Sequence, residues 1–424
     1  MNRNELHPDL NREYKNGLES GVEKIDHPKC ADMWFVVPPP PPKNIPNDLS
    51  VKLIAEAGKV ISNQPNIDKA SELDRLVSYL FLRKEAVESS RIEGTMSTID
   101  HVLTPGELFD EWKAKSEGAS VRGYAYAIEA ELKRVATDGL SVFTVDLVSR
   151  LHKQIMKHDP RFRGVPGKIR ENPIDVVCIR GQSPKPADSI YNPAPPRHVR
   201  RCLRDVMGWL ADPRLSELEN AGMGMPLIVR MAVLHAHFEA IHPFSDGNGR
   251  VGRMLIALQI ACNKKIPIYL SGYIEEEKSN YSKVLQAAQK RLNYAPIVEF
   301  FAEALIASSC EVDLTRKHIE NLPAAWLKRG NFRKESTAWR ALSWLMAHPI
   351  FTVKQLQEHF RVSPQSANIA VSFLQKKRIV RERTGYERNR VFAAEEVISL
   401  LSRRFGSSPE EAIDGAQHLM KNSL

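Results

Sequence analysis

The pattern of apolar and polar residues predicts a mainly helical protein. In LDRLVSYLFLRKEAVESSRIEGT, part of a helical stretch from about 48 to 115, apolar residues recur at helical spacing, and Gly94 is suited to end the helix. The same period predicts further helices at 124–135, 144–158, 197–212, 225–241, 250–263, 275–290 and 296–318.

Residues 160–198 interrupt this pattern. They are rich in Gly and Pro and contain one short β-like run, IDVVCIR. We therefore predict a loop that carries a β-hairpin, with Val176, Val177, Cys178 and Ile179 in a strand.

After residue 330 the pattern predicts a separate unit. Three short helices precede two short strands around a turn, which is the order of a winged helix-turn-helix. The candidate DNA contacts of such a unit are Gln365, Asn368, Arg383, Arg388 and Arg390. Packing or dimerisation is the alternative role, because this fold alone does not establish DNA binding.

The length of 424 residues is enough for two or three domains. We predict five segments: a polar, loosely ordered segment at 1–33, a helical region at 34–118, a core at 119–300, a linking helix at 301–329, and the winged helix-turn-helix with its tail at 330–424.

Composition narrows the class of protein. The five cysteines are scattered without a C-x-x-C pair, which argues against a zinc site or disulfide framework and for reduced thiols in the cytoplasm. No apolar run reaches the roughly 20 residues of a membrane helix, and the polar N-terminus is no signal peptide, so we expect no membrane partner. The net charge of +9 is compatible with nucleic acid as a partner and equally with an ordinary basic protein.

The stretch IHPFSDGNGRVGR at 241–253 carries the candidate chemistry. The apolar helix before it ends at His242, because Pro243 cannot continue a helix and disfavours the α region for the residue before it. His242 therefore lies at a corner, from which its side chain can point into a cleft.

An anion site follows this corner. Gly247, Asn248 and Gly249 allow positive φ angles, so consecutive N–H groups can form an anion nest at the start of the next helix. Arg250 and Arg253 share one face of its first turn, and a planar guanidinium binds phosphate oxygens in pairs.

Asp246 directly precedes the nest, where a carboxylate can hold a hard cation such as Mg²⁺ against phosphate oxygens. Each of these residues alone has a structural explanation, but a base, a metal ligand, a nest and two cations together favour function. They predict a site that transfers a phosphate group from a nucleotide.

HPFSDGNGRVGR is similar to the signature of the Fic (filamentation induced by cAMP) family, H-P-F-x-[D/E]-G-N-G-R-x-x-R, at every fixed position. The segments from VPPPPPKNIP to SSRIEGTMSTIDHVL and the C-terminal unit also resemble parts of long Fic proteins. The resemblance implies a helical Fic core with a β-hairpin flap. It also implies transfer of AMP from ATP to a Ser, Thr or Tyr hydroxyl of a target protein.

The resemblance assigns roles to the signature residues. His242 would be the general base and Asp246 the Mg²⁺ ligand. Gly247, Asn248 and Gly249 would cradle the phosphates, with a hydrogen bond from the Asn248 side chain.

The same resemblance assigns the two cations and the flap. Arg250 would neutralise the β-phosphate, and Arg253 would hold the γ-phosphate. The hairpin with Val176–Ile179 would align a target segment by strand addition.

SSRIEG at 89–94 resembles the inhibitory motif of the family, [S/T]-x-x-x-E-[G/N], with Ser89, Glu93 and Gly94. In that family the Glu pairs with the second Arg of the signature, here Arg253, so the γ-phosphate cannot bind productively. The resemblance implies intramolecular autoinhibition. An exposed, charged helix end is the alternative explanation.

YLSGYIEEEKSNYSKVL at 269–285 resembles the wall of the adenine site, with Tyr273 and Tyr281 as candidates. The third position after Tyr273 is often Asn in relatives and is Glu276 here, which departs from the pattern of the family.

We therefore predict a cytoplasmic AMP-transferring enzyme that uses ATP and Mg²⁺ and is autoinhibited by Glu93. Its partners are a target protein, a second copy in a homodimer, and the enzyme itself as a substrate. Three alternatives stay open: removal of AMP with Glu93 positioning water, transfer of another group, and regulation through DNA binding.

Overall fold

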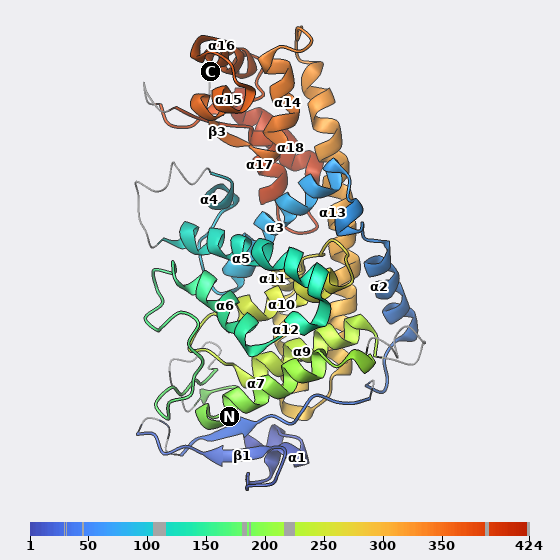
Figure 1. The fold of residues 1–424 in the computed structure, drawn as a ribbon, viewed down its shortest axis with the longest axis vertical. Coiled ribbons are helices and arrows are strands. Elements are labelled where there is room, and N and C mark those ends of the chain that lie inside the picture. Colours follow the sequence, from blue (N-terminus) through green and yellow to red (C-terminus); the bar gives the residue numbers. More distant parts are fainter. Residues whose placement is uncertain are drawn as a thin grey trace.

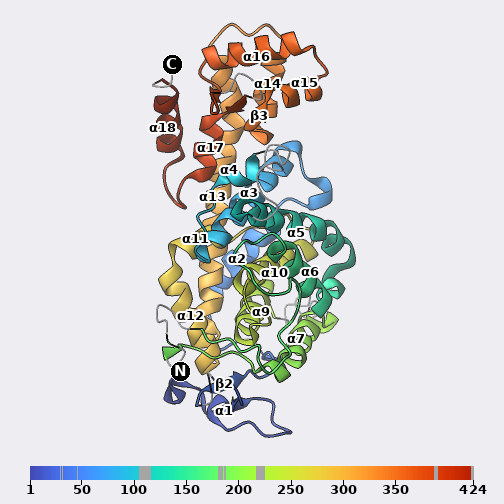
Figure 2. The same cartoon turned by 90° about the vertical axis from the view of Figure 1, so that its left-hand side faces the viewer.

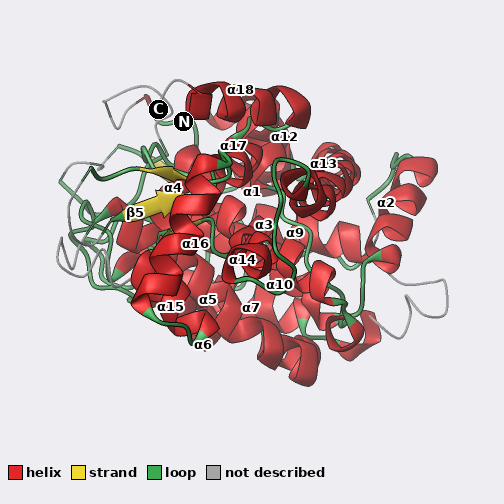
Figure 3. Ribbon diagram, turned by 90° about the horizontal axis from the view of Figure 1, so that it is seen from above, coloured by secondary structure: helices red, strands yellow, loops and turns green. Residues whose placement is uncertain are grey.

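Helices make up most of the chain, and the strands are short (Figures 1 and 3), so the mainly helical fold class is confirmed. The computed structural model describes residues 1–28, 30, 32–44, 46–104, 116–179, 185, 188–215, 225–385 and 390–421.

The described part of the N-terminal 33 residues is ordered, contrary to the loose segment that we predicted. β1 (Gly21–Lys24) pairs antiparallel with β2 (Trp34–Val37), with Val22 opposite Val36. Both of these valines are buried, as is Leu10 of α1 (Pro8–Asn11). The few apolar residues of this polar segment therefore anchor it at one end of the molecule (Figure 1).

The other described elements before the C-terminal unit are all helices. They are η1 (Arg3–Glu5), α2 (Val51–Asn63), η2 (Ile67–Lys69), α3 (Glu72–Ile92), α4 (Ile99–Leu103), α5 (Glu117–Asp138), η4 (Gly139–Val142), α6 (Val145–Met156), α7 (Pro196–Leu210), α9 (Leu227–Ile241), α10 (Asn248–Cys262), α11 (Ser271–Glu276), α12 (Lys278–Arg291) and α13 (Ala295–Leu327).

The central helix of the core is α9. All of its residues are buried, because LIVRMAVLHAHFEAI is apolar around most of its circumference and not along one stripe. Helices α7, α10, α12 and α13 pack around it. The end of α9 is therefore held rigidly, and the signature loop begins at that end.

α3 is also largely buried, although its sequence is rich in charge. Lys84 donates to the backbone carbonyls of Leu401 at 3.1 Å and Arg403 at 3.0 Å, and its Nζ lies 3.2 Å from Oε1 of Glu88. Glu85 accepts from the hydroxyl of Tyr124 at 2.9 Å. Hydrogen bonds thus compensate for the burial of these groups.

The C-terminal unit follows α13, a helix of 33 residues that runs out of the core and into this unit (Figure 1). The linking helix predicted at 301–329 is therefore part of a longer helix, which continues through Pro323. The remaining elements are α14 (Thr337–Ala347), β3 (Ile350–Thr352), α15 (Val353–Phe360), α16 (Pro364–Lys376), β4 (Arg381–Glu382), β5 (Val391–Ala393), α17 (Glu395–Ser402) and α18 (Pro409–Lys421).

The sheet of the C-terminal unit is antiparallel, with the strands in the order β3-β5-β4. The two strands expected from the sequence correspond to β4 and β5, and β3 between α14 and α15 is additional. Its residues IFT are all buried. A strand of three residues is too short to give a recognisable alternation of polar and apolar positions.

Candidate active site

The predicted corner at His242 is present. α9 ends at Ile241, and His242 has a left-handed backbone, with φ of 52° and ψ of 64°. Its N–H still donates to the carbonyl of Phe238 at 2.8 Å. Pro243 prevents the helix from continuing, so the chain turns at this residue.

Arg170 fixes this corner from the loop after α6. Its buried guanidinium donates to the carbonyls of His242 at 2.8 Å, Ile241 at 3.1 Å, Ala194 at 3.0 Å and Asp175 at 2.9 Å. Burial lowers the pKa of Arg170 to about 10. One side chain thus satisfies carbonyls that the end of α9 leaves without an intrahelical partner.

The imidazole of His242 faces a buried carboxylate. Nδ1 of His242 lies 3.7 Å from Oε2 of Glu239, one turn earlier on α9. Burial opposes the charged form of Glu239, but the nearby His242, His235 and Arg253 hold its pKa below the ordinary value. The anionic Glu239 favours a proton on Nδ1 and leaves Nε2 as the acceptor.

The signature loop is closed by side-chain hydrogen bonds. Asn248 accepts from the N–H of Phe244 at 2.9 Å and donates to the carbonyl of the same residue at 2.8 Å. The resemblance implied a phosphate-binding role for this amide. In the structure, both of its polar atoms hold the loop, so its contribution to the site is at least partly structural.

His152 supports the loop from behind, and the sequence analysis missed it. Its ring stacks on Phe244 with centroids 3.7 Å apart. Nδ1 accepts from the N–H of Gly167 at 2.8 Å, so Nε2 carries the proton that is shared with the carbonyl of Asp246 at 3.1 Å. Burial lowers the pKa of His152 to about 4, which keeps the ring neutral. Its place on the apolar stripe of α6 was the available signal.

Both signature glycines are required by close contacts. Gly247 has φ of 79°, and a Cβ there would lie 2.7 Å from Sδ of Met156. A Cβ on Gly249 would collide with Oε1 of Glu93. Gly247 and Gly249 therefore place no side chain at the start of α10. The first N–H groups of this helix, which have no intrahelical partner, lie beside the cavity described below.

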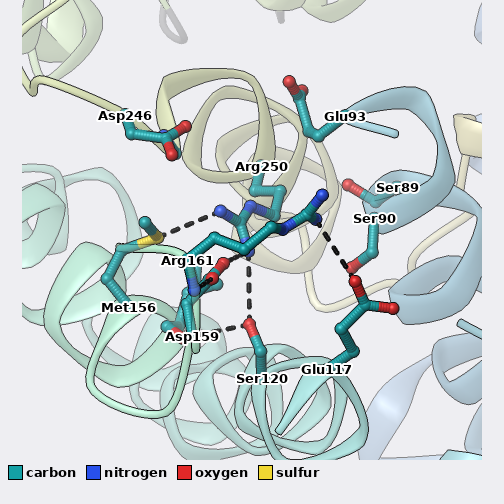
Figure 4. Close-up of polar contacts among 12 residues, drawn as sticks. Ser89, Ser90, Glu93, Glu117, Ser120, Met156, Asp159, Arg161, Asp246 and Arg250 are labelled. Carbon is teal, nitrogen blue, oxygen red and sulfur yellow. Dashed lines mark hydrogen bonds and ion pairs between the residues drawn. The ribbon is translucent and has the colours of Figure 1, made fainter. Parts of the chain in front are cut away.

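Arg250 is directed away from that cavity, in contrast to the predicted β-phosphate contact. Its guanidinium donates to Asp159 at 2.9 Å and Ser120 at 3.2 Å, and it contacts Sδ of Met156 at 3.1 Å (Figure 4). The Asp159 side chain is itself only 4% exposed. This buried ion pair already neutralises Arg250, which joins the start of α10 to α5 and the end of α6.

Arg253 forms the pair with Glu93 that the resemblance implied, and it also binds Ser89. Its Nη2 donates to Oε1 of Glu93 at 2.7 Å and to the carbonyl of Ser89 at 2.8 Å, and its Nε donates to Oγ of Ser89 at 2.8 Å. Burial disfavours its charge, but Glu93 and two phenol groups raise its pKa above the ordinary value. Gly94, with φ of 80°, ends α3 directly after Glu93.

The signature loop, the start of α10 and the end of α3 border a cavity of about 290 Å³. His242, Asp246, Gly247–Gly249, Arg253 and Glu93 line one side of it. α12 closes another side with Tyr281, Ser282, Leu285, Gln286, Gln289 and Lys278, which the sequence analysis missed except for Tyr281.

Of the predicted adenine wall, only Tyr281 lines this cavity. Its hydroxyl lies 2.6 Å from Nε2 of His235. The ring of Tyr273 packs against Phe300 instead. Glu276 forms an ion pair with Arg404 at 3.0 Å. The prediction was therefore wrong for these two residues, because α11 directs their side chains toward α13 and the C-terminal segment.

Within the described residues, the predicted flap contributes one antiparallel bridge, between Ile179 and Tyr191. The N–H of Ile179 donates to the carbonyl of Tyr191 at 2.9 Å. Val176, Val177 and Cys178 have no strand assignment. Ile179 lines the cavity, while much of the chain between the two bridge residues lies outside the described ranges.

Two of the predicted DNA contacts on the wing, Arg383 and Arg390, form ion pairs. Arg383 pairs with Asp100 of α4 and, at 2.7 Å, with Glu395. Arg390 lies 3.5 Å from Glu382. Arg383 thus joins the wing to α4 and α17, whereas Arg390 pairs within the wing.

Two of the remaining predicted DNA contacts lie on α16, and the third lies outside the described residues. Gln365 and Asn368 are exposed on α16. The amide of Asn368 donates to the carbonyl of Pro364 in the same helix at 2.9 Å. Arg388 lies outside the described residues.

The fold and the site thus define a helical protein with a polar cavity at a helix N-terminus. Residues 142–260 match the Fic/DOC family, and residues 51–132 match the N-terminal region of that family. The chain belongs to the Fic family.

Named relatives match parts of this chain. A probable protein adenylyltransferase of Aquifex aeolicus is 27% identical over 117 residues, which are 26% of this chain and 34% of that protein. Protein adenylyltransferases of Caenorhabditis briggsae and Caenorhabditis elegans are 26% and 29% identical over 39% and 28% of this chain, and 28% and 21% of their own lengths. The chain thus spans about a third or less of these relatives.

Solved structures show a distant likeness. A Fic family protein from Desulfovibrio desulfuricans has 19% identity and a TM-score of 0.47, over 83% of this chain and 98% of that one. A Fic domain protein from Bacteroides thetaiotaomicron has 19% identity and a TM-score of 0.45, over 63% and 97%. Among the described residues, no helix combines the length and the apolar content that a membrane span needs.

Proposed function

We propose that this protein transfers AMP from ATP to a hydroxyl group of a protein, and that its own hydroxyl groups are among the substrates. The observation that carries the proposal is that His242, Asp246, the N-terminus of α10 and Arg253 line one cavity. A base, an anion site and a cation are what nucleotidyl transfer to a hydroxyl requires. The adenylyltransferase names of the relatives support the same reaction.

In this proposal His242 is the general base. Its Nδ1 faces the anionic Glu239, so Nε2 is free to accept the proton of the incoming hydroxyl. The hydroxyl oxygen forms a bond to the α-phosphorus, the bond from that phosphorus to the bridging oxygen breaks, and pyrophosphate leaves. Arg170 contributes by holding the backbone of His242 in place.

Asp246 would hold the Mg²⁺ ion. Its carboxylate is exposed at the cavity and accepts from the N–H of Gly247 at 2.6 Å. One carboxylate beside a phosphate site fits Mg²⁺, which commonly binds one or two carboxylates, substrate phosphates and several waters. When bound, the ion would neutralise the charge of the phosphates.

Autoinhibition by Glu93 is the second part of the proposal. The Glu93 carboxylate is bound to Arg253, the cation that would otherwise bind the γ-phosphate. Ser89 holds the same guanidinium from the side of α3. Two anions would compete for one cation, and the intramolecular one is always present.

A labelling experiment tests the reaction. The purified protein is incubated with Mg²⁺ and ATP that is labelled at either the α- or the γ-phosphate, alone and with cell lysate. We expect protein-bound label from the α-position only, and its loss in His242→Ala. Label from the γ-position would show phosphate transfer and contradict the proposal. A second reaction with AMP-modified protein measures release of AMP, because Glu93 and His242 share the cavity and could also direct a water molecule.

A further inference from the structure

A second hollow, of about 370 Å³, lies in the C-terminal unit, remote from the signature loop. Five of the residues that line it are cationic: Arg329, Lys376, Lys377, Arg378 and Lys421. Gln417 and Met420 complete the lining, so none of the described lining residues is acidic.

One wall of this hollow is fixed by a buried carboxylate. Glu396 is fully buried and accepts from Arg329 at 2.6 and 2.8 Å, from Gln417 at 2.8 Å and from the indole of Trp326 at 2.5 Å. Arg329 also donates to the carbonyl of Arg378 at 2.8 Å, where the backbone has φ of 55°. Glu396 thus neutralises Arg329 and fixes the side chains of Arg329 and Gln417 in this wall.

Among the described residues, the other four cations have no acidic partner. Lys376, Lys377, Arg378 and Lys421 form no ion pair with any residue in the described part of the chain; Lys377 only lies over the ring of Phe373, at 5.6 Å. Four positive charges around one hollow repel each other, and they attract a polyanion.

The hollow is continuous with the exposed face of α16. Gln365, Ile369, Ser372 and Lys376 follow each other at intervals of three and four residues, and all four are exposed. Ile369 is 63% exposed, so its side chain is accessible for an apolar contact with a partner. α16 lies across the outer end of the molecule, and α18 lies beside α17 (Figure 2).

We propose that this face binds duplex DNA, with α16 in the major groove and the basic hollow on the phosphate backbone. A helix of 13 residues is about 20 Å long, and the major groove, at about 12 Å wide, admits such a helix. Lys376 joins the two surfaces, because it ends the exposed stripe of α16 and also lines the hollow. Gln365 can reach base edges, and Ile369 can contact thymine methyl groups.

This assignment differs from a contact made by the wing. Arg383 is bound to Glu395 and Asp100, so it would have to give up two carboxylates before it could bind phosphate. Lys376, Lys377, Arg378 and Lys421 form no ion pair among the described residues, so they need no such exchange.

The test uses the full-length protein and a labelled duplex of mixed sequence, with binding measured by fluorescence anisotropy at several salt concentrations. The variant is Lys376→Gln/Lys377→Gln/Lys421→Gln. We expect its affinity at the lowest salt concentration to fall about 10- to 100-fold. The slope of log K against log salt should become shallower by about 2.7, since each lost phosphate contact contributes about 0.9.

The matched control is Lys52→Gln/Lys59→Gln/Lys69→Gln, which removes the same charge from exposed positions in the N-terminal helical region. Its salt slope should equal that of the wild type. Equal slopes for the hollow variant and the wild type would overturn the proposal, provided that both unfold at the same temperature.

Ile369→Ala tests the groove contact separately. It should weaken duplex binding without changing the salt slope. Competition by polyglutamate as strong as that by unlabelled duplex would identify an acidic protein as the partner and refute the DNA assignment. Competition by pyrophosphate at a similar concentration would identify a small anion as the ligand and would also refute the DNA assignment.

Discussion

Replacing Glu93 tests the proposed link between the end of α3 and the phosphate site. Glu93→Gly removes the carboxylate from Arg253 but leaves both hydrogen bonds from that guanidinium to Ser89. Arg253 should therefore keep its orientation and present a free Nη2 to the γ-phosphate. Glu93→Gln is the matched control for charge, because it keeps the length of the side chain.

The expected gain follows from one charge-assisted hydrogen bond. Such a bond is worth roughly 1.5–3 kcal/mol, and the Glu93 side chain is 33% exposed, so the lower half of this range applies. About 2 kcal/mol corresponds to a roughly 30-fold higher rate of AMP transfer. Glu93→Gln should give an intermediate gain, since it removes the charge but still occupies the space.

The assay is self-modification with α-labelled ATP at saturating ATP and Mg²⁺. Adding Arg253→Ala to Glu93→Gly should cancel the gain, because no cation then remains for the γ-phosphate. If wild type and Glu93→Gly incorporate AMP equally, while His242→Ala incorporates none, autoinhibition is refuted and the catalytic role of His242 stands.

Three further predictions concern buried charge. Asp159→Asn should lower the free energy of unfolding by about 3–5 kcal/mol in urea titrations, because it leaves the buried Arg250 without its carboxylate; an effect below 1 kcal/mol would show that Arg250 finds another partner. Lys84→Met should cost about 3 kcal/mol in the same assay, as it leaves a buried carboxylate and two carbonyls unpaired; no loss would show that the C-terminal contact of α3 is not stabilising. Burial lowers the pKa of His152 to about 4 and of His237 to about 3. Each stays neutral when folded but takes up a proton when unfolded, so stability should fall as the pH drops from 6.5 toward 4, and His237→Phe should reduce the slope by up to one proton; an unchanged slope would mean that this ring is protonated in the fold.

Rules about neighbouring residues predicted those parts of the site whose geometry depends on the local sequence. Pro243 fixes the corner at His242, and the sequence shows this without any tertiary information. The apolar run before it predicts α9, whose bounds agree closely with the predicted helix. Gly94 similarly marks the end of α3.

The same rules failed where a residue far away in the sequence determines which way a side chain points. Arg250 and Arg253 are three residues apart, so spacing predicts similar directions. Asp159, far away in the sequence, binds Arg250, whereas Glu93 binds Arg253. Spacing gives the angle around α10 but not the neighbour on each side, so it could not separate the roles of the two arginines.

α3 connects the C-terminal unit to the signature site. Lys84 binds carbonyls of Leu401 and Arg403, at the end of α17, while Glu93, nine residues later, binds Arg253. Nine residues of helix span about 14 Å, and a buried helix moves as one body. The C-terminal unit therefore holds the same element that places a carboxylate on Arg253. We therefore expect that a shift of that unit along α3 would either break the contacts of Lys84 or move Glu93 relative to Arg253.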